Sequence, residues 1–127
     1  GVHRCPLDFL QPMQLREKLE GPFRELEKHL RQLGEASADG VELLLVHNAG
    51  TLGPLSYSQD IGDEDVQAAM SVNVTSFAIL NDAFLQRFTS SAMAELRVHV
   101  RIVNISSLLA VEAFPSWSLY ATGKAAR

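Results

Sequence analysis

The sequence lacks several features that mark common classes of protein. Cys5 is the only cysteine in 127 residues, so no internal disulfide can form, which fits a reducing compartment. Lys and Arg number 11 against 15 Asp and Glu, and no segment is a basic stripe, so a nucleic-acid partner is not expected. No uninterrupted apolar run approaches the roughly 20 residues that span a bilayer. The histidines show no metal-ligand spacing with Cys5 or the acids, and no metal site is predicted.

The chain also opens without a methionine or a signal peptide. Its first residue is Gly1, and we expect an internal piece of a longer, cytoplasmic protein. With 46% hydrophobic and 20% charged residues, it has the composition of a soluble globular domain. One domain, residues 1–127, is expected.

Apolar residues recur in a pattern that predicts alternating strands and helices. In chain order we expect the end of a strand at 1–8, a helix over about 19–33, a strand at 41–47, a helix from 63 to about 88, a strand at 97–106 and a helix beginning near 118. Such alternation predicts an α/β fold with a parallel sheet, in which ligands bind beyond the C-terminal ends of the strands.

Two of these elements carry a more specific expectation. Gly21-Pro22 interrupts the apolar face that runs from Leu19 to Leu33, which predicts a kink or two abutting helices. The run VELLLVH at 41–47 is short and nearly all apolar, which is typical of a parallel strand buried on both faces.

Tyr120 and Lys124 are the first candidates for chemistry. An i,i+4 pair lies on one face of a helix. A free tyrosine has a pKa of about 10, and a cation within roughly 4–6 Å favours the phenolate, which prepares a tyrosine for general acid or base catalysis. A solvated surface pair is the alternative interpretation.

Three further groups of polar or small residues lie where a site is expected, and each has a structural alternative. Asn73 interrupts an apolar helix stripe, and it either bonds the backbone or points into a site. Ser106 and Ser107 end the second strand, where serines also serve as turns or caps. The segment Asn48-Ala49-Gly50 follows the first strand and is either a turn or a close approach to a ligand.

Together these residues resemble the short-chain dehydrogenases/reductases over essentially the whole chain. HNAG (47–50) looks like that family's N-N-A-G segment, SVNVTS holds its helix asparagine as Asn73, and IVNISS (102–107) resembles its serine strand. Tyr120 and Lys124 match its Y-x-x-x-K, and the spacing to Tyr120 selects Ser107 over Ser106. His47 replaces the usual Asn and is a departure that concerns a strand-linking hydrogen bond.

The resemblance implies a partial doubly wound parallel sheet of Rossmann type. The family's glycine-rich N-terminal βαβ unit and its C-terminal strands are absent from this sequence, so one face or edge of the sheet should be exposed. NADPH is the implied cofactor, with contacts from Asp8, Phe9, Asn48, Ala49, Gly50, Tyr120 and Lys124. The catalytic residues carried over are Ser107, Tyr120, Lys124 and Asn73.

The segment WSLYATGKAAR narrows the resemblance to members that reduce the side-chain ketone of pterins. It has Gly123 before the lysine, where most members have Ser. Substrate contacts are implied for Ser107, Leu108, Trp117 and Tyr120, and a homodimer is implied for the full-length protein. Two alternatives stay open: a general reductase of carbonyl, dicarbonyl or 3-oxoacyl substrates, and an inactive truncated fragment that only associates with intact subunits.

Overall fold

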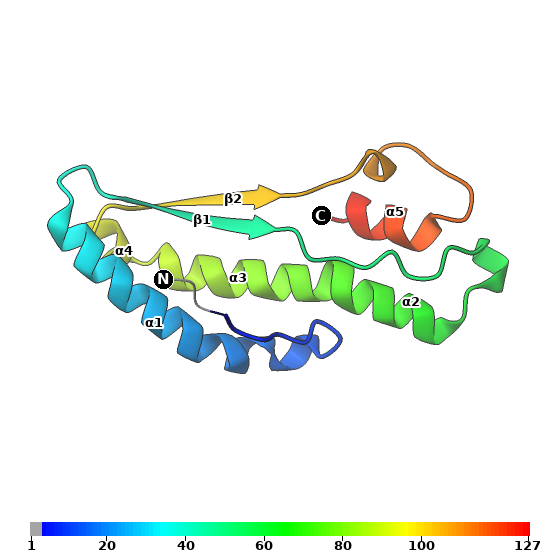
Figure 1. Cartoon of the computed structure of the whole chain (residues 1–127), viewed down its shortest axis with the longest axis horizontal. Coiled ribbons are helices and arrows are strands. Elements are labelled where there is room, and N and C mark those ends of the chain that lie inside the picture. Colours follow the sequence, from blue (N-terminus) through cyan, green and yellow to red (C-terminus); the bar gives the residue numbers. More distant parts are fainter. Residues whose placement is uncertain (1–3) are drawn as a thin grey trace.

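A computed structural model describes residues 4–127 and shows two strands lying over a layer of helices (Figure 1). The helices are α1 (Leu15–Ala36), α2 (Asp63–Met70), α3 (Ser76–Phe88), α4 (Ser91–Glu95) and α5 (Ser118–Ala125), and the strands are β1 (Val41–His47) and β2 (Val98–Asn104). The predicted elements from the first helix onward are confirmed, and α4 is an addition that the sequence pattern did not indicate.

β1 and β2 are parallel neighbours, with Val41 opposite Val98 and His47 opposite Asn104. Parallel neighbours need a long crossover, and here the helical stretch from Asp63 to Phe88 supplies most of it (Figure 1). The C-terminal ends of both strands point toward α5, so the loops that follow them meet this helix. The predicted α/β fold, a partial doubly wound parallel sheet, is confirmed.

The expected strand end at residues 1–8 is not found in the part that the structure describes. Residues 1–3 lie outside the described residues, and Arg4 to Asp8 have no regular structure. Pro6 has no N–H to donate to a ladder. The Asp8 carboxylate accepts a hydrogen bond from the backbone N–H of Leu10 at 2.9 Å, so the chain turns here.

α1 is one continuous helix, although Pro22 lies inside it, so of the two expectations, a kink or two abutting helices, the second is wrong and the first stays a prediction. Proline disfavours the helical conformation of the preceding residue partly through that residue's Cβ. Gly21 has no Cβ, which reduces this conflict. Leu19 and Leu30 of the predicted apolar face are buried, whereas Leu33 is 54% exposed.

The core lies between α1, α3 and the helix-facing side of the sheet. Phe84 and Phe88 of α3 and Phe23 of α1 form a cluster of rings with centroids 4.9–6.0 Å apart. Leu43 of β1 and Met93 of α4 pack into the same cluster. Met93 is 1% exposed, and its burial explains why the short α4 is held against the sheet.

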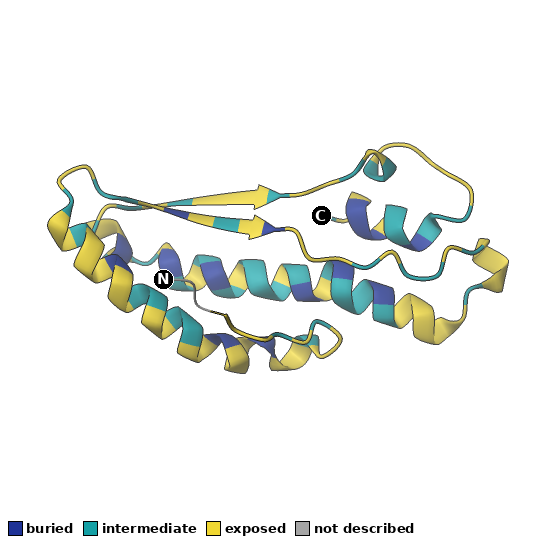
Figure 2. Ribbon diagram, in the orientation of Figure 1, coloured by how far each residue is buried: buried dark blue, intermediate teal, exposed yellow. Residues whose placement is uncertain are grey.

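The sheet face that points away from the helices is open (Figure 2). Leu44 and Val46 of β1 are 53% and 47% exposed, and Val103 of β2 is 40% exposed. Burial of β1 on both faces was the wrong expectation for this structure, because the helices within residues 4–127 cover only one face. The expectation of an exposed face is confirmed.

The predicted helix from residue 63 to 88 is continuous but contains a π-helical turn, Ser71–Thr75, between α2 and α3. Such turns insert a residue into a helix and occur often at functional sites. Asn73 lies in the middle of this turn and is 1% exposed. The turn therefore directs the polar side chain of Asn73 inward from the apolar face of the helix.

The stretch Asp63–Phe88 is long and apolar enough to span a membrane by length and composition alone. Core helices of soluble proteins meet the same criterion. Here Arg87 forms ion pairs with Glu20 and Glu27 of α1, and the phenylalanines nearby pack in the core. We therefore interpret this stretch as a core helix.

Gly40, between α1 and β1, gives a test of the fold. Its φ is +86°, and a Cβ added there would lie 2.5 Å from the backbone oxygen of Arg97, which accepts the Val41 N–H. We expect Gly40→Ala to lower the free energy of unfolding by about 3 kcal/mol, measured by urea denaturation. Asp39→Ala, at the exposed neighbouring position, should change it by less than about 0.5 kcal/mol. Equal effects of the two substitutions would contradict this account.

Candidate active site

Tyr120 and Lys124 lie on one face of α5, as the i,i+4 spacing predicted. The Lys124 ammonium nitrogen is 5.6 Å from the centroid of the Tyr120 ring. It also donates a hydrogen bond of 2.6 Å to the backbone oxygen of Ile105, which follows β2. This bond fixes the end of the lysine side chain between α5 and the C-terminal end of the sheet.

Lys124 is only 6% exposed, which is unusual for a lysine. Burial lowers the pKa of Lys124 below its ordinary value of 10.5, and the nearby Arg127 cation lowers this pKa further. Its ammonium has three donors, and Ile105 occupies one of them. The solvated surface pair that the sequence left open is therefore excluded for Lys124.

Ser107 begins the short 3-10 helix Leu108–Ala110 as its N-cap. Its Oγ accepts a hydrogen bond of 3.3 Å from the Leu109 N–H, so the cap interpretation describes what the structure shows. Acting as acceptor here leaves the hydroxyl proton available for another acceptor. Ser107 is half-buried and Ser106 is exposed, and the short helix packs against α5.

Asn73 bonds the backbone of the loop that follows β1. Its Oδ1 accepts the Thr51 N–H at 2.9 Å, and its Nδ2 donates to the Thr51 oxygen at 2.8 Å. Of the two interpretations from the sequence, this geometry matches backbone bonding. Thr51 itself was not predicted, because a single amide in a helix does not indicate which loop it will bind. A role for Asn73 in placing water stays a prediction.

Of the two predicted substrate contacts Trp117 and Leu108, Trp117 contacts the Tyr120 ring and Leu108 is exposed on the neighbouring 3-10 helix. The Trp117 and Tyr120 rings meet edge to face with centroids 5.9 Å apart. Leu108 is 59% exposed on the 3-10 helix. An aromatic surface therefore lies directly beside Tyr120, and the exposed Leu108 extends the apolar surface of the neighbouring loop.

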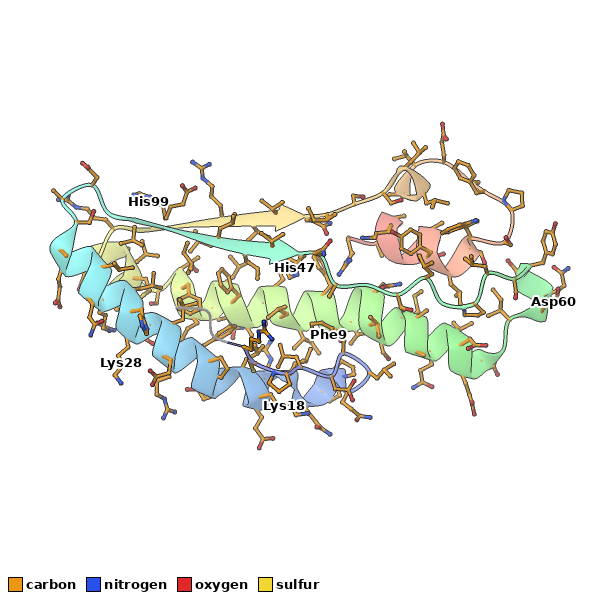
Figure 3. The ribbon with its side chains drawn as sticks, in the orientation of Figure 1. Phe9, Lys18, Lys28, His47, Asp60 and His99 are labelled. Carbon is orange, nitrogen blue, oxygen red and sulfur yellow. The ribbon has the colours of Figure 1, made fainter. Side chains whose placement is uncertain are left out.

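The predicted cofactor contacts at residues 8–9 and 48–50 are only partly brought together. Phe9, Asn48 and Ala49 line one cavity of about 80 Å³ together with His47 at the end of β1. Figure 3 labels Phe9 and His47. Gly50 is not part of its lining. The carboxylate of Asp8 is used in the turn that precedes α1.

Arg127 is a site residue that the sequence reasoning missed. It donates a hydrogen bond of 2.7 Å to the backbone oxygen of Ala49, and its guanidinium carbon lies 5.0 Å from the Phe77 ring centroid. Its Nε and Nη1 atoms are buried without a hydrogen-bond partner within residues 4–127. No local pattern indicated this role, because Arg127 follows the last residue of α5 by two positions and its partner Ala49 lies 78 residues earlier in the chain.

His47, the departure from the family segment, is buried at the end of β1 at 4% exposure. Its Nε2 lies 3.3 Å from the Asn81 Oδ1, and its ring meets Phe77 edge to face at 4.5 Å. Burial lowers the pKa of His47 below its ordinary 6.5, the bond to Asn81 raises it by less, and the Arg127 cation adds to the lowering.

This shift predicts a pH dependence of stability. Below its ordinary pKa of 6.5, His47 takes up a proton more readily in the unfolded chain than in the folded one. The free energy of unfolding should therefore fall as the pH drops from about 6.5 toward the lowered folded pKa. His47→Asn should flatten this dependence in urea denaturation between about pH 5 and 8. Parallel profiles of parent and variant would contradict it.

Comparison with known proteins identifies the class to which this fold and site belong. The family model described as short chain dehydrogenase matches residues 23–127, and the chain belongs to this family. Sepiapterin reductase from Meriones unguiculatus is 37% identical over 111 residues, which cover 85% of this chain and 40% of that protein. Sepiapterin reductase from Rattus norvegicus is 41% identical over 87 residues, covering 67% of this chain and 32% of that protein.

Other matches are more distant. Benzil reductase ((S)-benzoin forming) from Bacillus subtilis is 26% identical over 107 residues, covering 84% of this chain and 41% of that protein. The structure of ElxO with NADP bound has a TM-score of 0.63 at 23% identity and covers 94% of this chain and 41% of its own. That likeness shows the fold alone. The chain spans 32–41% of the length of these three curated relatives.

Proposed function

We propose that this chain carries the catalytic side chains of an NADPH-dependent carbonyl reductase that reduces pterin side-chain ketones, as in tetrahydrobiopterin synthesis. The observation that carries the proposal is the buried Lys124 ammonium, fixed by Ile105 and held 5.6 Å from the Tyr120 ring. A buried cation beside a tyrosine is an arrangement suited to proton transfer. The relatives named sepiapterin reductase support the pterin substrate.

Each side chain has one role in the proposed reaction. Tyr120 donates its hydroxyl proton to the carbonyl oxygen of the substrate. Ser107 donates a hydrogen bond to the same oxygen and orients it. Trp117, edge to face with Tyr120, and Leu108 offer an apolar surface to the flat pterin ring. Asn73, in the π-helical turn that packs against α5, positions a water that relays protons to Lys124.

The residues present fit a nicotinamide cofactor. Lys124 keeps two donors after its bond to Ile105, which suits the two hydroxyls of a ribose. The cavity lined by Phe9, Asn48 and Ala49 lies at the end of β1, where α/β sheets bind nucleotides, and its volume of about 80 Å³ admits only part of one. NADPH, when bound, supplies the hydride that adds to the carbonyl carbon.

A broader carbonyl substrate range is a second candidate, favoured by the match to benzil reductase. The rate of NADPH oxidation with sepiapterin and with benzil, at equal concentrations, separates the two. Faster turnover of sepiapterin supports the pterin assignment. Faster turnover of benzil overturns it and leaves a general carbonyl reductase.

A catalytically inactive fragment that associates with intact subunits is a third candidate. The chain spans 40% of one relative and 32% of another, and one sheet face is open. Titration of the chain with NADPH, followed by cofactor fluorescence, tests this directly. Saturable binding overturns the inactive fragment.

For the whole protein we propose a cytoplasmic homodimer that uses α3 and α5 as its contact helices, because the family resemblance implies it.

A further inference from the structure

Asn73 is enclosed by glycines from two other segments. A Cβ added to Gly50, in the loop after β1, would lie 3.1 Å from the Asn73 Oδ1. A Cβ added to Gly123, in α5, would lie 2.7 Å from the Asn73 Cβ and 2.9 Å from its Nδ2. The loop, the π-helical turn and α5 therefore meet at the Asn73 side chain.

The contact at Gly123 cannot accommodate a larger residue by a rotamer change. The nearest atom is the Cβ of Asn73, which is fixed to the backbone of the π-helical turn. Its amide is held in turn by both hydrogen bonds to Thr51. Ordinary carbon contacts are roughly 3.5–4.0 Å, so in this chain a side chain at residue 123 must separate α5 from the turn by about 1 Å. Family members with Ser at this position must already have the wider spacing.

We infer that Gly123 is a positioning residue, which sets how closely α5 approaches the π-helical turn and thereby where Tyr120 and Lys124 stand. The two residues lie on the same short helix as Gly123, and Lys124 is its direct neighbour. A displacement of α5 also moves the Lys124 ammonium relative to Ile105, to which it bonds at 2.6 Å. The inference that Gly123 sets the position of α5 is independent of the proposed function. The inference that this position affects catalysis rests on the proposed function.

The positional part is tested without any activity measurement. Trp117 is the only tryptophan in the chain and lies at the start of α5, so its fluorescence reports on this helix. In Gly123→Ala we expect a shifted Trp117 emission and faster hydrogen exchange of the Thr51 amide, measured by NMR. The matched control is Thr122→Ala, at an exposed neighbouring position of α5, which raises helix propensity in a similar way without touching Asn73. Identical spectra for the two variants overturn the inference.

A double-mutant cycle covers the case in which Gly123→Ala folds poorly. Asn73→Gly removes the Cβ that the new methyl group meets. If this contact is the cause, Gly123→Ala lowers the Tm of the parent by several degrees and leaves the Tm of Asn73→Gly unchanged or higher. An equal decrease in both backgrounds overturns the steric explanation.

Kinetics test the catalytic part in the longest polypeptide that contains this chain. A shift of about 1 Å in reacting groups lowers rates on the order of 10²-fold. We therefore expect Gly123→Ala to lower kcat by more than about tenfold with a smaller change in KM, while Thr122→Ala keeps both. Changed spectra with unchanged kcat overturn the catalytic part only. If the parent itself reduces no carbonyl, the proposed function fails and the positional result still stands.

Discussion

Tyr120→Phe is expected to lower the rate of NADPH-dependent sepiapterin reduction by about 10²-fold or more. The substitution removes only the hydroxyl that is proposed to protonate the carbonyl oxygen. The phenylalanine ring keeps the edge-to-face contact with Trp117 and stays beneath the Lys124 ammonium. The Tm should therefore change little, and NADPH should lose at most its contact with the Tyr120 hydroxyl, so most of the loss is in kcat.

The second tyrosine of the chain supplies the control. Tyr57 is 60% exposed, in the loop between β1 and α2, and Tyr57→Phe removes the same hydroxyl group. We expect this variant to keep the parent rate. The measurement is the initial rate of NADPH oxidation, followed by cofactor absorbance, with both variants in the longest polypeptide that contains the chain. A Tyr120→Phe rate close to the parent rate would show that another group supplies the proton.

The strands and long helices were predictable because their signals are local. VELLLVH is β1 residue for residue, and α2 begins at residue 63 as predicted. Pro22 does not divide α1 into two helices, because its effect depends on Gly21 before it and on the packing of the helix around it. The short α4 was missed since its one buried anchor, Met93, has no periodic partner within so few residues.

Burial was harder to predict than secondary structure. An apolar strand shows that its side chains favour burial, but the sequence does not show which segments cover them. Leu44 and Val46 are thus apolar and half exposed, because helices within residues 4–127 lie on one face of the sheet only. The open face is consistent with a chain that spans 40% of the length of one of its relatives.

The candidate site was predictable where two residues share one element. Tyr120 and Lys124 share a face of α5 through their spacing, and the structure brings them together. Contacts between elements were not predictable in this way. The bond from Lys124 to Ile105 and the contact of Arg127 with Ala49 join residues 19 and 78 positions apart, which no local pattern connects.

Lys124→Met is expected to abolish most of the reductase activity while leaving the stability at neutral pH nearly unchanged. Methionine keeps the length and apolar stem of the side chain but has no charge. Loss of the hydrogen bond to Ile105 destabilises the folded chain. Removal of the free-energy cost of burying an ammonium at 6% exposure stabilises it. These two effects oppose each other, so the unfolding free energy should change by less than about 1 kcal/mol.

The high-pH behaviour of the same variant tests the burial directly. The pKa of Lys124 is lowered from 10.5 by burial and by the Arg127 cation, so the folded chain releases this proton before the unfolded chain does. The unfolding free energy of the parent should then rise with pH between the lowered pKa and 10.5, and Lys124→Met should lack this rise. Lys18→Met, at an exposed position of α1, should retain it.

A buried charge that contributes little to stability and much to activity is the signature of a functional residue rather than a structural one. If the free energy of unfolding of Lys124→Met is instead several kcal/mol lower and the variant still reduces sepiapterin, Lys124 has a structural role and links α5 to the end of β2. Loss of activity with the Tm preserved, and NADPH binding weakened because the two ribose contacts are gone, would place the ammonium in the cofactor site. The unfolding free energy and the turnover rate, measured on the same variant, therefore separate the two roles of the lysine.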